Sequence, residues 1–412
     1  MFPGAVGRVL HVVGDKLTSL EVFAGAGGLA LGTQLAGFHS LGIIEWDKWA
    51  CSTMRVNKQH GYPLVREWSI HEMDVREFDW ASVRQEVDVL AGGPPCQPFS
   101  VGGVSKAHED ARDMFPAMIA AVNALKPRAF VVENVKGLLR SQFSDYYHYI
   151  LLRLEFPERV IEEGESWSEH LRRLQKAKTS SPQPRGELTY NVIPTLVNAA
   201  DYGVPQKRER VFIVGFRSDL GIRWSFPEPT HSLAALKWAQ REGGEYWQRH
   251  GIAPTVPRAH PSRPADGCLP WRTVRDALQG LPASCDGRET WALNHELRRG
   301  ARAYPGHTGS SLDMPSKTLK AGVHGVPGGE NMFIADDGAP QYYTVREAAR
   351  IQTFPDGYRL DGAWSEAMRQ LGNAVPVLLA QRVLSSVAQA IVLNEAEYRM
   401  HTDKAQVLRW TA

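Results

Sequence analysis

Short apolar segments alternate with helical patterns along the first half of the chain. Five of these segments are strand candidates, at residues 20–23, 41–44, 87–90, 129–132 and 211–216. Near-continuous apolar runs of this length are typical of strands buried on both faces, and strands that alternate with helices form parallel sheets. From Ser19 to about Phe226 the pattern therefore predicts an α/β fold with a Rossmann-like, doubly wound, mainly parallel sheet.

The pattern changes after Phe226. Pro, Gly, Arg and Trp become frequent, and regular periods are rare until Thr344, a candidate N-cap for a helix over residues 344–350. The chain then passes through residues 372–376 into an apolar helix over residues 377–393. Because 412 residues are many for one domain, we predict two: a discontinuous larger domain over residues 1–225 and 363–412, and a smaller one over residues 226–362.

Composition and charge exclude only a few classes of protein. The formal net charge of +2 is too small for a wholly basic surface, so contact with nucleic acid would depend on local clusters. The four cysteines contain no CxxC pair, which disfavours a zinc site and a disulfide framework. No apolar run approaches the ~18 residues of a membrane span, and the first 20 residues lack a signal-peptide pattern. We therefore expect a reduced, soluble, cytoplasmic protein with no metal site.

One cysteine lies in a rigid loop directly after a predicted strand. Residues 92–100 read GGPPCQPFS, so that Cys96 has prolines on both sides. Proline fixes φ, and the backbone around the thiol is therefore held in direction. A buried, inert thiol is the alternative, since free cysteine behaves as a small hydrophobe. The flanking prolines and glycines disfavour a core position and make Cys96 a candidate nucleophile.

Charged residues adjoin two further strand candidates. Glu133 directly follows the strand at 129–132, which places its carboxylate at the carboxyl edge of the sheet, where α/β proteins form their sites. Arg208 and Arg210 enter the strand at 211–216 at alternate positions and therefore share a face. Taken singly, such groups are usually solvated or ion-paired. In combination with the cysteine they form a candidate catalytic set.

A glycine-rich loop follows the first strand. Gly25, Gly27 and Gly28 let a ligand approach the backbone at the start of a helix, whose N–H groups favour a carboxylate or a phosphate. Gly25, Gly27 and Ala30 also match the dinucleotide pattern G-x-G-x-x-G/A, and Glu45 stands where a ribose-binding acid is expected. An NAD-dependent oxidoreductase is therefore an alternative, but it leaves the cysteine, the glutamate and the arginines without a role.

Eight segments together resemble the DNA (cytosine-5) methyltransferase family of bacterial type, in the motif order usual for that family. They are FAGAGG at 23–28, EWD at 45–47, DV at 74–75, PCQ at 95–97, ENV at 133–135, QKRER at 206–210, PSKTL at 315–319 and GNAVP at 372–376. One departure is Met314, where the family usually has an arginine before the proline. The resemblance implies a class I S-adenosylmethionine-dependent methyltransferase fold, with residues 226–362 as the target-recognition domain.

The resemblance also implies S-adenosylmethionine as the cofactor. Glu45 would bind the ribose hydroxyls, the indole of Trp46 would lie on the adenine, and Asp74 would accept from the adenine amino group. For the apolar residues of the pocket, plain core packing is the alternative. The complete set implied for the cofactor is Phe23, Gly25, Ala26, Gly27, Gly28, Leu29, Glu45, Trp46, Asp74, Val75, Gly93, Pro95, Met114, Asn373 and Val375.

The catalytic chemistry follows from the same resemblance. Cys96 would add to carbon 6 of cytosine and so activate carbon 5 for methylation, while Glu133 would bond to the ring nitrogen at position 3. Arg210 would hold the carbonyl oxygen of the base, with Arg208 in support. A stacked cytosine cannot reach a thiol, so the base would be flipped out of the duplex. Gly102 and Gly103 fit a loop that closes over it, although a plain surface turn would also contain glycines.

The implied partner is double-stranded DNA with a specific short target sequence. Eight arginines of the second domain would neutralise phosphates or read base edges, unless they are ordinary surface arginines: Arg258, Arg263, Arg272, Arg275, Arg288, Arg298, Arg299 and Arg302. We expect a monomer that works in phage defence or beside a restriction endonuclease, which would act on the same site without stable association. A relative that acts on transfer RNA and a non-catalytic DNA-binding protein are the alternatives.

A charged insertion separates two of the strand candidates. Residues 153–178 are densely charged with both signs, and a Ser- and Pro-rich stretch follows over residues 180–186. The composition predicts a solvated helix and a linker, and an accessory DNA contact is the alternative.

Overall fold

The structure is a computed structural model that describes residues 16–95, 113–180, 186–254, 262, 264–284, 291–321 and 331–410, with side chains as far as residue 398. Several residues singled out from the sequence lie outside these ranges. They are Cys96, Gly102, Gly103, Arg258, Arg263, Cys285 and Arg288.

The centre of the molecule is a seven-stranded sheet with the strand order β3-β2-β1-β4-β5-β7-β6. Its strands are β1 (Thr18–Val22), β2 (His39–Glu45), β3 (Ile70–Glu72), β4 (Val89–Gly92), β5 (Ala129–Val135), β6 (Tyr190–Asn198) and β7 (Glu209–Arg217). The first five strands are parallel to one another, and β7 pairs antiparallel with both β5 and β6. The prediction of a doubly wound, mainly parallel sheet is confirmed.

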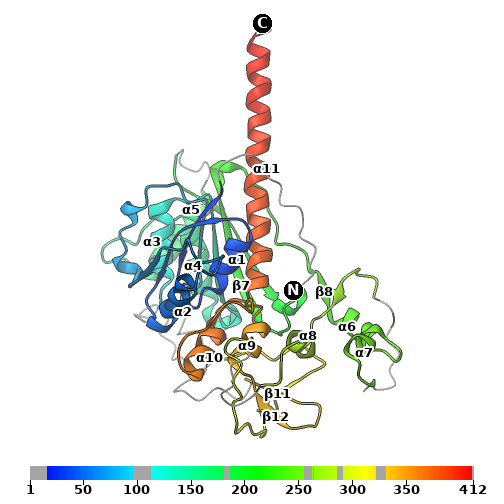
Figure 1. The fold of residues 1–412 in the computed structure, drawn as a ribbon. Helices are drawn as coiled ribbons and strands as arrows, with labels where there is room; N and C mark the ends of the chain where they lie inside the picture. Colours follow the sequence, from blue (N-terminus) through cyan, green and yellow to red (C-terminus); the bar gives the residue numbers. More distant parts are fainter. Residues whose placement is uncertain are drawn as a thin grey trace.

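Helices cover both faces of the sheet (Figure 1). On one face, α3 (Phe115–Leu125), α4 (Ser144–Glu155) and α5 (Trp167–Thr179) form a buried cluster with Leu20, Leu90 and Val132 of the strands. On the other face, α1 (Gly28–Leu35) and α11 (Val377–Trp410) pack on the alternate strand residues Val89 and Val131. This division follows from the period of two in β-strands, since successive side chains point to opposite faces.

The contact between α1 and α11 is unusually close. A Cβ atom on Gly32 would lie only 2.3 Å from the Cβ of Ala380, so glycine is required where the two helices touch. In this way the end of the chain packs beside its beginning, and α11 continues beyond the sheet (Figure 1).

The stretch Trp364–Tyr398 is long and apolar enough to cross a membrane by length and composition, and half of its most apolar window is buried inside the protein. Its buried side chains pack on the sheet in one core cluster: Leu379, Val383, Leu384, Val387 and Ile391. Packing in this core accounts for the apolar composition.

The rest of the chain forms shorter elements below the carboxyl edge of the sheet (Figure 1). They are α2 (Lys48–Gln59), β8 (His231–Ser232), α6 (Leu233–Ala239), α7 (Glu245–His250), β9 (Leu269–Pro270), α8 (Val274–Leu278), β10 (Ser310–Ser311), β11 (Met332–Ile334), β12 (Pro340–Tyr342), α9 (Val345–Ile351) and α10 (Trp364–Asn373). One core cluster joins Ala26 and Ile43 of the first part to Leu319, Phe333 and Val345 of the second. The two parts therefore share a hydrophobic core.

The charged insertion forms a helix with a buried face. Helix α5 starts at Trp167, later than its composition predicts, and a capping box between Ser166 and Glu169 fixes its first turn. His170, Leu171, Leu174 and Ala177 are buried, and their spacing places them on one side of the helix. The prediction of a solvated helix is therefore wrong for this side, because one apolar stripe packs on the protein even in a strongly charged sequence.

Candidate active site

The glycine loop turns sharply between β1 and α1. Phe23, Gly25 and Gly27 have φ values of 56°, 54° and 82°, in the left-handed region that glycine adopts without strain. A Cβ atom on Gly28 would lie 2.3 Å from the carbonyl oxygen of Val375, so the segment 372–376 passes directly over the start of α1. The structure thus brings two widely separated predicted cofactor segments together.

Glu45 organises this loop from the end of β2. Its Oε2 accepts from the N–H of Gly25 at 2.7 Å, and its Oε1 accepts from the N–H groups of Trp46 and Asp47 at 2.8 Å each. Burial raises the pKa of Glu45, and the three backbone donors act in the opposite direction. Beside it the Trp46 side chain is 70% exposed, which leaves a ring face open to a ligand.

Asp74 caps the short 3-10 helix η1 (Val75–Glu77) by accepting from the N–H of Arg76 at 2.9 Å. Both of its carboxylate oxygens also accept from the guanidinium of Arg76, which lowers the pKa of Asp74. The carboxylate is therefore ionised and able to accept a further hydrogen bond. Arg76 was not anticipated, although its position two residues after the acid is visible in the sequence.

A second unanticipated residue is Glu21, in the middle of β1. Its side chain is buried, and neither carboxylate oxygen has a hydrogen-bond partner among the described residues. Burial raises the pKa of Glu21 well above its usual value, and the charge of Glu45 adds to the shift. By strand alternation it lies on the face opposite to Leu20 and Val22, the face that α1 covers. The signal in the sequence that could have identified Glu21 is an acidic residue within an apolar strand segment.

Glu133 and Arg210 meet at the carboxyl edge of the sheet. Arg210 Nε lies 2.8 Å from Glu133 Oε1, and the two side chains are only 11% and 9% exposed. Antiparallel pairing of β5 with β7 brings them together, since Glu133 lies opposite Phe212 and Val135 lies opposite Arg210. Burial lowers the pKa of Arg210, and the carboxylate opposes that shift.

Residues at the same sheet edge contact Gly93 and Pro94, which shortly precede Cys96 in the sequence. Asn134 Nδ2 donates to the carbonyl oxygen of Pro94 at 3.0 Å, and a Cβ atom on Gly93 would lie 3.3 Å from Glu133 Oε2. The described part of the candidate site therefore comprises the acid, the arginine and the backbone that immediately precedes the candidate nucleophile.

Two other cysteines are described, and neither resembles a nucleophile. Cys51 is wholly buried beneath the glycine loop, and burial raises the pKa of its thiol to about 12. The pKa of Cys268 is also raised by desolvation. Nor does any group of three or more His, Cys, Asp or Glu in the described ranges have the arrangement of a metal site.

Arg208 has a different environment from Arg210. It is fully buried and donates to three backbone carbonyls, those of Leu319 at 3.1 Å, Gly372 at 2.7 Å and Ala374 at 3.0 Å. Desolvation lowers the pKa of its guanidinium well below the usual value. The structure thus uses Arg208 to join segments 315–319 and 372–376 to the sheet, while its catalytic role stays a prediction.

Two glutamines reinforce this junction. Gln206 accepts from the N–H of Leu319 at 3.0 Å and donates to Gln352 Oε1 at 3.1 Å. Gln352 in turn donates to the carbonyl oxygens of Leu371 and Ala374. No local pattern identifies Gln352, because its partners lie on other segments of the chain.

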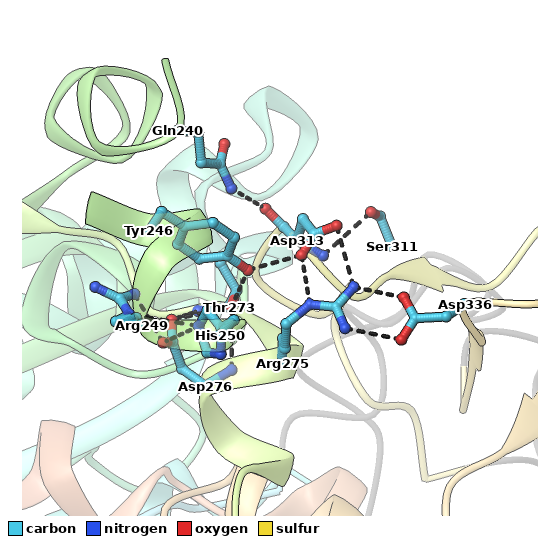
Figure 2. A network of polar contacts seen from close by, with 10 residues as sticks. All are labelled: Gln240, Tyr246, Arg249, His250, Thr273, Arg275, Asp276, Ser311, Asp313 and Asp336. Atoms are coloured by element: carbon cyan, nitrogen blue, oxygen red, sulfur yellow. Dashed lines mark hydrogen bonds and ion pairs between the residues drawn. The ribbon is translucent and has the colours of Figure 1, made fainter. Parts of the chain in front are cut away.

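A polar network joins several elements within the predicted second domain (Figure 2). Arg275 Nε donates to Asp313 at 2.7 Å, and the two terminal nitrogens donate to Asp336 at 2.9 and 2.7 Å. The hydroxyl of Tyr246 donates to Asp313 at 2.8 Å and contacts Thr273, which begins α8. Arg275 is therefore engaged inside the domain, which makes it a poor candidate for reading DNA.

The sheet, the glycine loop and the buried pair at the carboxyl edge define the class of protein, a Rossmann-like methyltransferase. The family model of C-5 cytosine-specific DNA methylases matches residues 17–156, 182–249 and 288–389. The chain therefore belongs to this family, and it is a DNA (cytosine-5) methyltransferase.

Individual relatives agree. Type II methyltransferase M.Eco47II of Escherichia coli is 33% identical over 384 residues, which span 91% of this chain and 79% of the relative. Type II methyltransferase M.PspPI of Psychrobacter sp. is 31% identical over 380 residues, spanning 92% and 80%. Among solved structures, the S. pombe Dnmt2 methyltransferase shares the fold with a TM-score of 0.54 and 16% identity, over 91% of this chain and 99% of that one.

Proposed function

We propose that this enzyme transfers the methyl group of S-adenosylmethionine to carbon 5 of one cytosine in a specific double-stranded DNA sequence. The observation that carries the proposal is the Glu133–Arg210 pair beside the segment that leads to Cys96, at the same sheet edge as the glycine loop. Base chemistry and cofactor binding would then take place side by side.

The residues of the loop fit the cofactor. The left-handed turn leaves open space for a ligand at Gly25, where a Cβ atom would meet nothing within 4 Å, and Trp46 offers an open ring face. Glu45 and Asp74 would accept hydrogen bonds from the ribose and the adenine amino group. The remaining residues of the proposed pocket are Phe23, Ala26, Gly28, Leu29, Val75, Gly93, Pro95, Met114, Asn373 and Val375. The cofactor supplies a methyl group on a sulfonium, which is an electrophile.

The protein would make the cytosine reactive. The thiolate of Cys96 adds to carbon 6, and Glu133, bonded to the ring nitrogen at position 3, offsets the charge that develops on the ring. Arg210 holds the carbonyl oxygen of the base and keeps Glu133 oriented. After methylation, carbon 5 loses its proton to a base, which can be water, and the thiolate of Cys96 leaves carbon 6. The target must first rotate out of the duplex.

We further propose that residues 226–362 recognise the target sequence and that residues 1–225 and 363–412 form the catalytic domain. The Type II relatives support a role beside a restriction endonuclease or in phage defence. The enzyme would act as a monomer in the cytoplasm, bound to DNA and without stable association with the nuclease. Bisulfite sequencing of a plasmid from cells that express the protein would identify the methylated cytosine.

A duplex with fluorine at carbon 5 of the target cytosine tests the mechanism. Thiolate addition and methyl transfer can proceed, but fluorine cannot leave as a proton, so the enzyme should remain attached to the DNA. The expected result is a cofactor-dependent adduct that survives denaturing electrophoresis and is absent for Cys96→Ser. A binder without catalysis would dissociate in denaturant, and an enzyme specific for transfer RNA would trap only on that RNA. No adduct at a site already shown to be methylated would overturn the covalent mechanism.

A further inference from the structure

The segment between β4 and α3 begins and ends at one backbone junction. The N–H of Met114 donates to the carbonyl oxygen of Pro95 at 3.4 Å, which joins the end of β4 to the start of α3. Asp113, beside this junction, accepts from the N–H of Phe115 through Oδ1 at 3.1 Å. Pro95 and Met114 belong to the proposed cofactor pocket, and Cys96 directly follows Pro95 in the sequence.

The other oxygen of Asp113 is bound from α4. The hydroxyl of Tyr146 donates to Asp113 Oδ2. The ring of Tyr146 is buried and lies 5.9 Å from the rings of both Tyr149 and Trp167, so the hydroxyl cannot easily turn away. One phenol hydroxyl thus connects the packed interior of α4 to the junction.

Helix α5 packs against α4 and stabilises it. Trp167 is its first residue and packs edge-on against Tyr146. Buried His170 of α5 contacts the hydroxyl of Tyr149 through Nδ1 and the carbonyl oxygen of Arg159 through Nε2, at 2.9 Å each. An ion pair between Arg173 and Glu165 secures the turn before the helix.

This support lies outside the part of the chain that the family model matches. The family model matches residues 17–156 and resumes at residue 182, so that α5 lies outside the match. The insertion therefore adds packing behind the active site that the family pattern does not contain.

We propose that Tyr146 is a positioning residue for methyl transfer, and that the α5 insertion braces it. Tyr146 fixes Asp113, and Asp113 in turn fixes the junction of Pro95 with Met114. The junction sets a wall of the proposed cofactor pocket and the position of Pro95, which Cys96 follows in the sequence. The proposal rests on the proposed function, and it assigns to the insertion a role in catalysis without contact to DNA.

The test compares two tyrosines of α4 that each lose one buried hydroxyl. Tyr146→Phe retains the ring packing but removes the hydrogen bond to Asp113 Oδ2, and we expect kcat for methyl transfer to fall about tenfold and the KM for S-adenosylmethionine to rise a few-fold. The matched control Tyr149→Phe loses its bond to His170 and should keep the wild-type kcat. Melting temperature and DNA affinity are measured for both variants, to separate positioning from a general loss of structure.

A double-mutant cycle completes the test. Because Asp113→Ala breaks the same connection, adding Tyr146→Phe to it should reduce kcat no further, while Asp113→Asn, which retains an acceptor oxygen, should restore part of the rate. Wild-type kcat and KM in Tyr146→Phe, or an equal loss in Tyr149→Phe, would overturn the proposal. A wild-type enzyme that methylates no DNA would instead overturn the proposed function, and this inference with it.

Discussion

Glu133 and Arg210 form a buried ion pair that has two tasks. Each charge compensates the desolvation of the other, and each is also assigned to the flipped base. The pair is therefore a structural contact in the free enzyme that must also accept a ligand. Because the pair must both stabilise the fold and bind the base, both side chains lie at the rim of the sheet rather than deeper in the core.

At this scale we predict the effect of Glu133→Gln. The amide keeps the shape of the side chain but cannot take up a proton and share it with the ring nitrogen of the base, so turnover should fall by about 10²-fold or more. DNA affinity should change little. Single-turnover methylation and DNA binding are measured in parallel, and a near-normal rate would assign the carboxylate a purely structural role.

Individual residues were predicted unequally well from sequence. Glu133, Arg210 and the glycine loop stand in short motifs at strand ends, and the structure places all of them at one sheet edge. Glu21 was missed because its strand was predicted from the apolar residues on either side of it. The structural role of Arg208 was missed because its partners lie 111 to 166 residues away. Contacts over such separations cannot be deduced from local pattern.

Among the elements, the start of α9 was predicted correctly from the local sequence. Thr344 accepts from the N–H of Glu347, and the Glu347 carboxylate accepts from the N–H of Thr344 at 2.8 Å, which confirms the predicted N-cap. Burial raises the pKa of Glu347 to about 7. The carboxyl group is therefore protonated in the folded protein at a pH where it would be ionised in the unfolded chain.

This difference predicts a pH dependence of stability. Between about pH 4.5 and 7 the unfolded chain loses the proton of Glu347 and the folded protein keeps it, so this group lowers the free energy of unfolding by about 3 kcal/mol as the pH rises through that range. Glu347→Gln should remove this contribution. Urea denaturation at pH 5 and pH 8 measures it, and an unchanged difference between wild type and variant at the two pH values would contradict the assignment.

Strands with one exposed face were harder to predict than buried ones. The sequence pattern indicated β1, β2, β4, β5 and β7 but missed both edge strands, β3 and β6, in which most side chains are partly exposed or exposed. An edge strand lacks the continuous apolar run that marks a central strand. The start of α5 was also predicted wrongly. Only four of its residues are buried, so its apolar pattern is too weak to mark where the helix begins.

At the scale of the whole molecule, the fold depends on chain segments that return from far along the sequence. Arg208 and Gln352 bind segment 372–376 between α10 and α11, Gln206 binds Leu319, and α11 covers one sheet face. The proposed cofactor pocket includes Asn373 and Val375 from this returning segment. Pocket and tertiary assembly are therefore coupled.

Arg208→Met tests the coupling. The variant would remove the Arg208 hydrogen bonds from three carbonyl groups, of which that of Ala374 keeps its bond from Gln352, and we expect a loss of about 3 kcal/mol in the free energy of unfolding. Affinity for S-adenosylmethionine should fall as well, since segment 372–376 lies directly over Gly28. Urea denaturation and calorimetric titration measure the two effects. Arg66→Met, at a side chain that is 67% exposed, is the control and should behave as wild type.

The close packing of Gly32 against Ala380 has a consequence for biosynthesis. The strands emerge from the ribosome long before α11, so the nascent chain carries an uncovered apolar sheet face and an unfinished cofactor pocket. At translation rates of 5 to 20 residues per second, the about 360 residues that separate α1 from the buried end of α11 take roughly 20 to 70 s. During that interval the apolar sheet face stays exposed on the nascent chain, and methylation becomes possible only after α11 has been synthesised and has packed on α1 and the sheet.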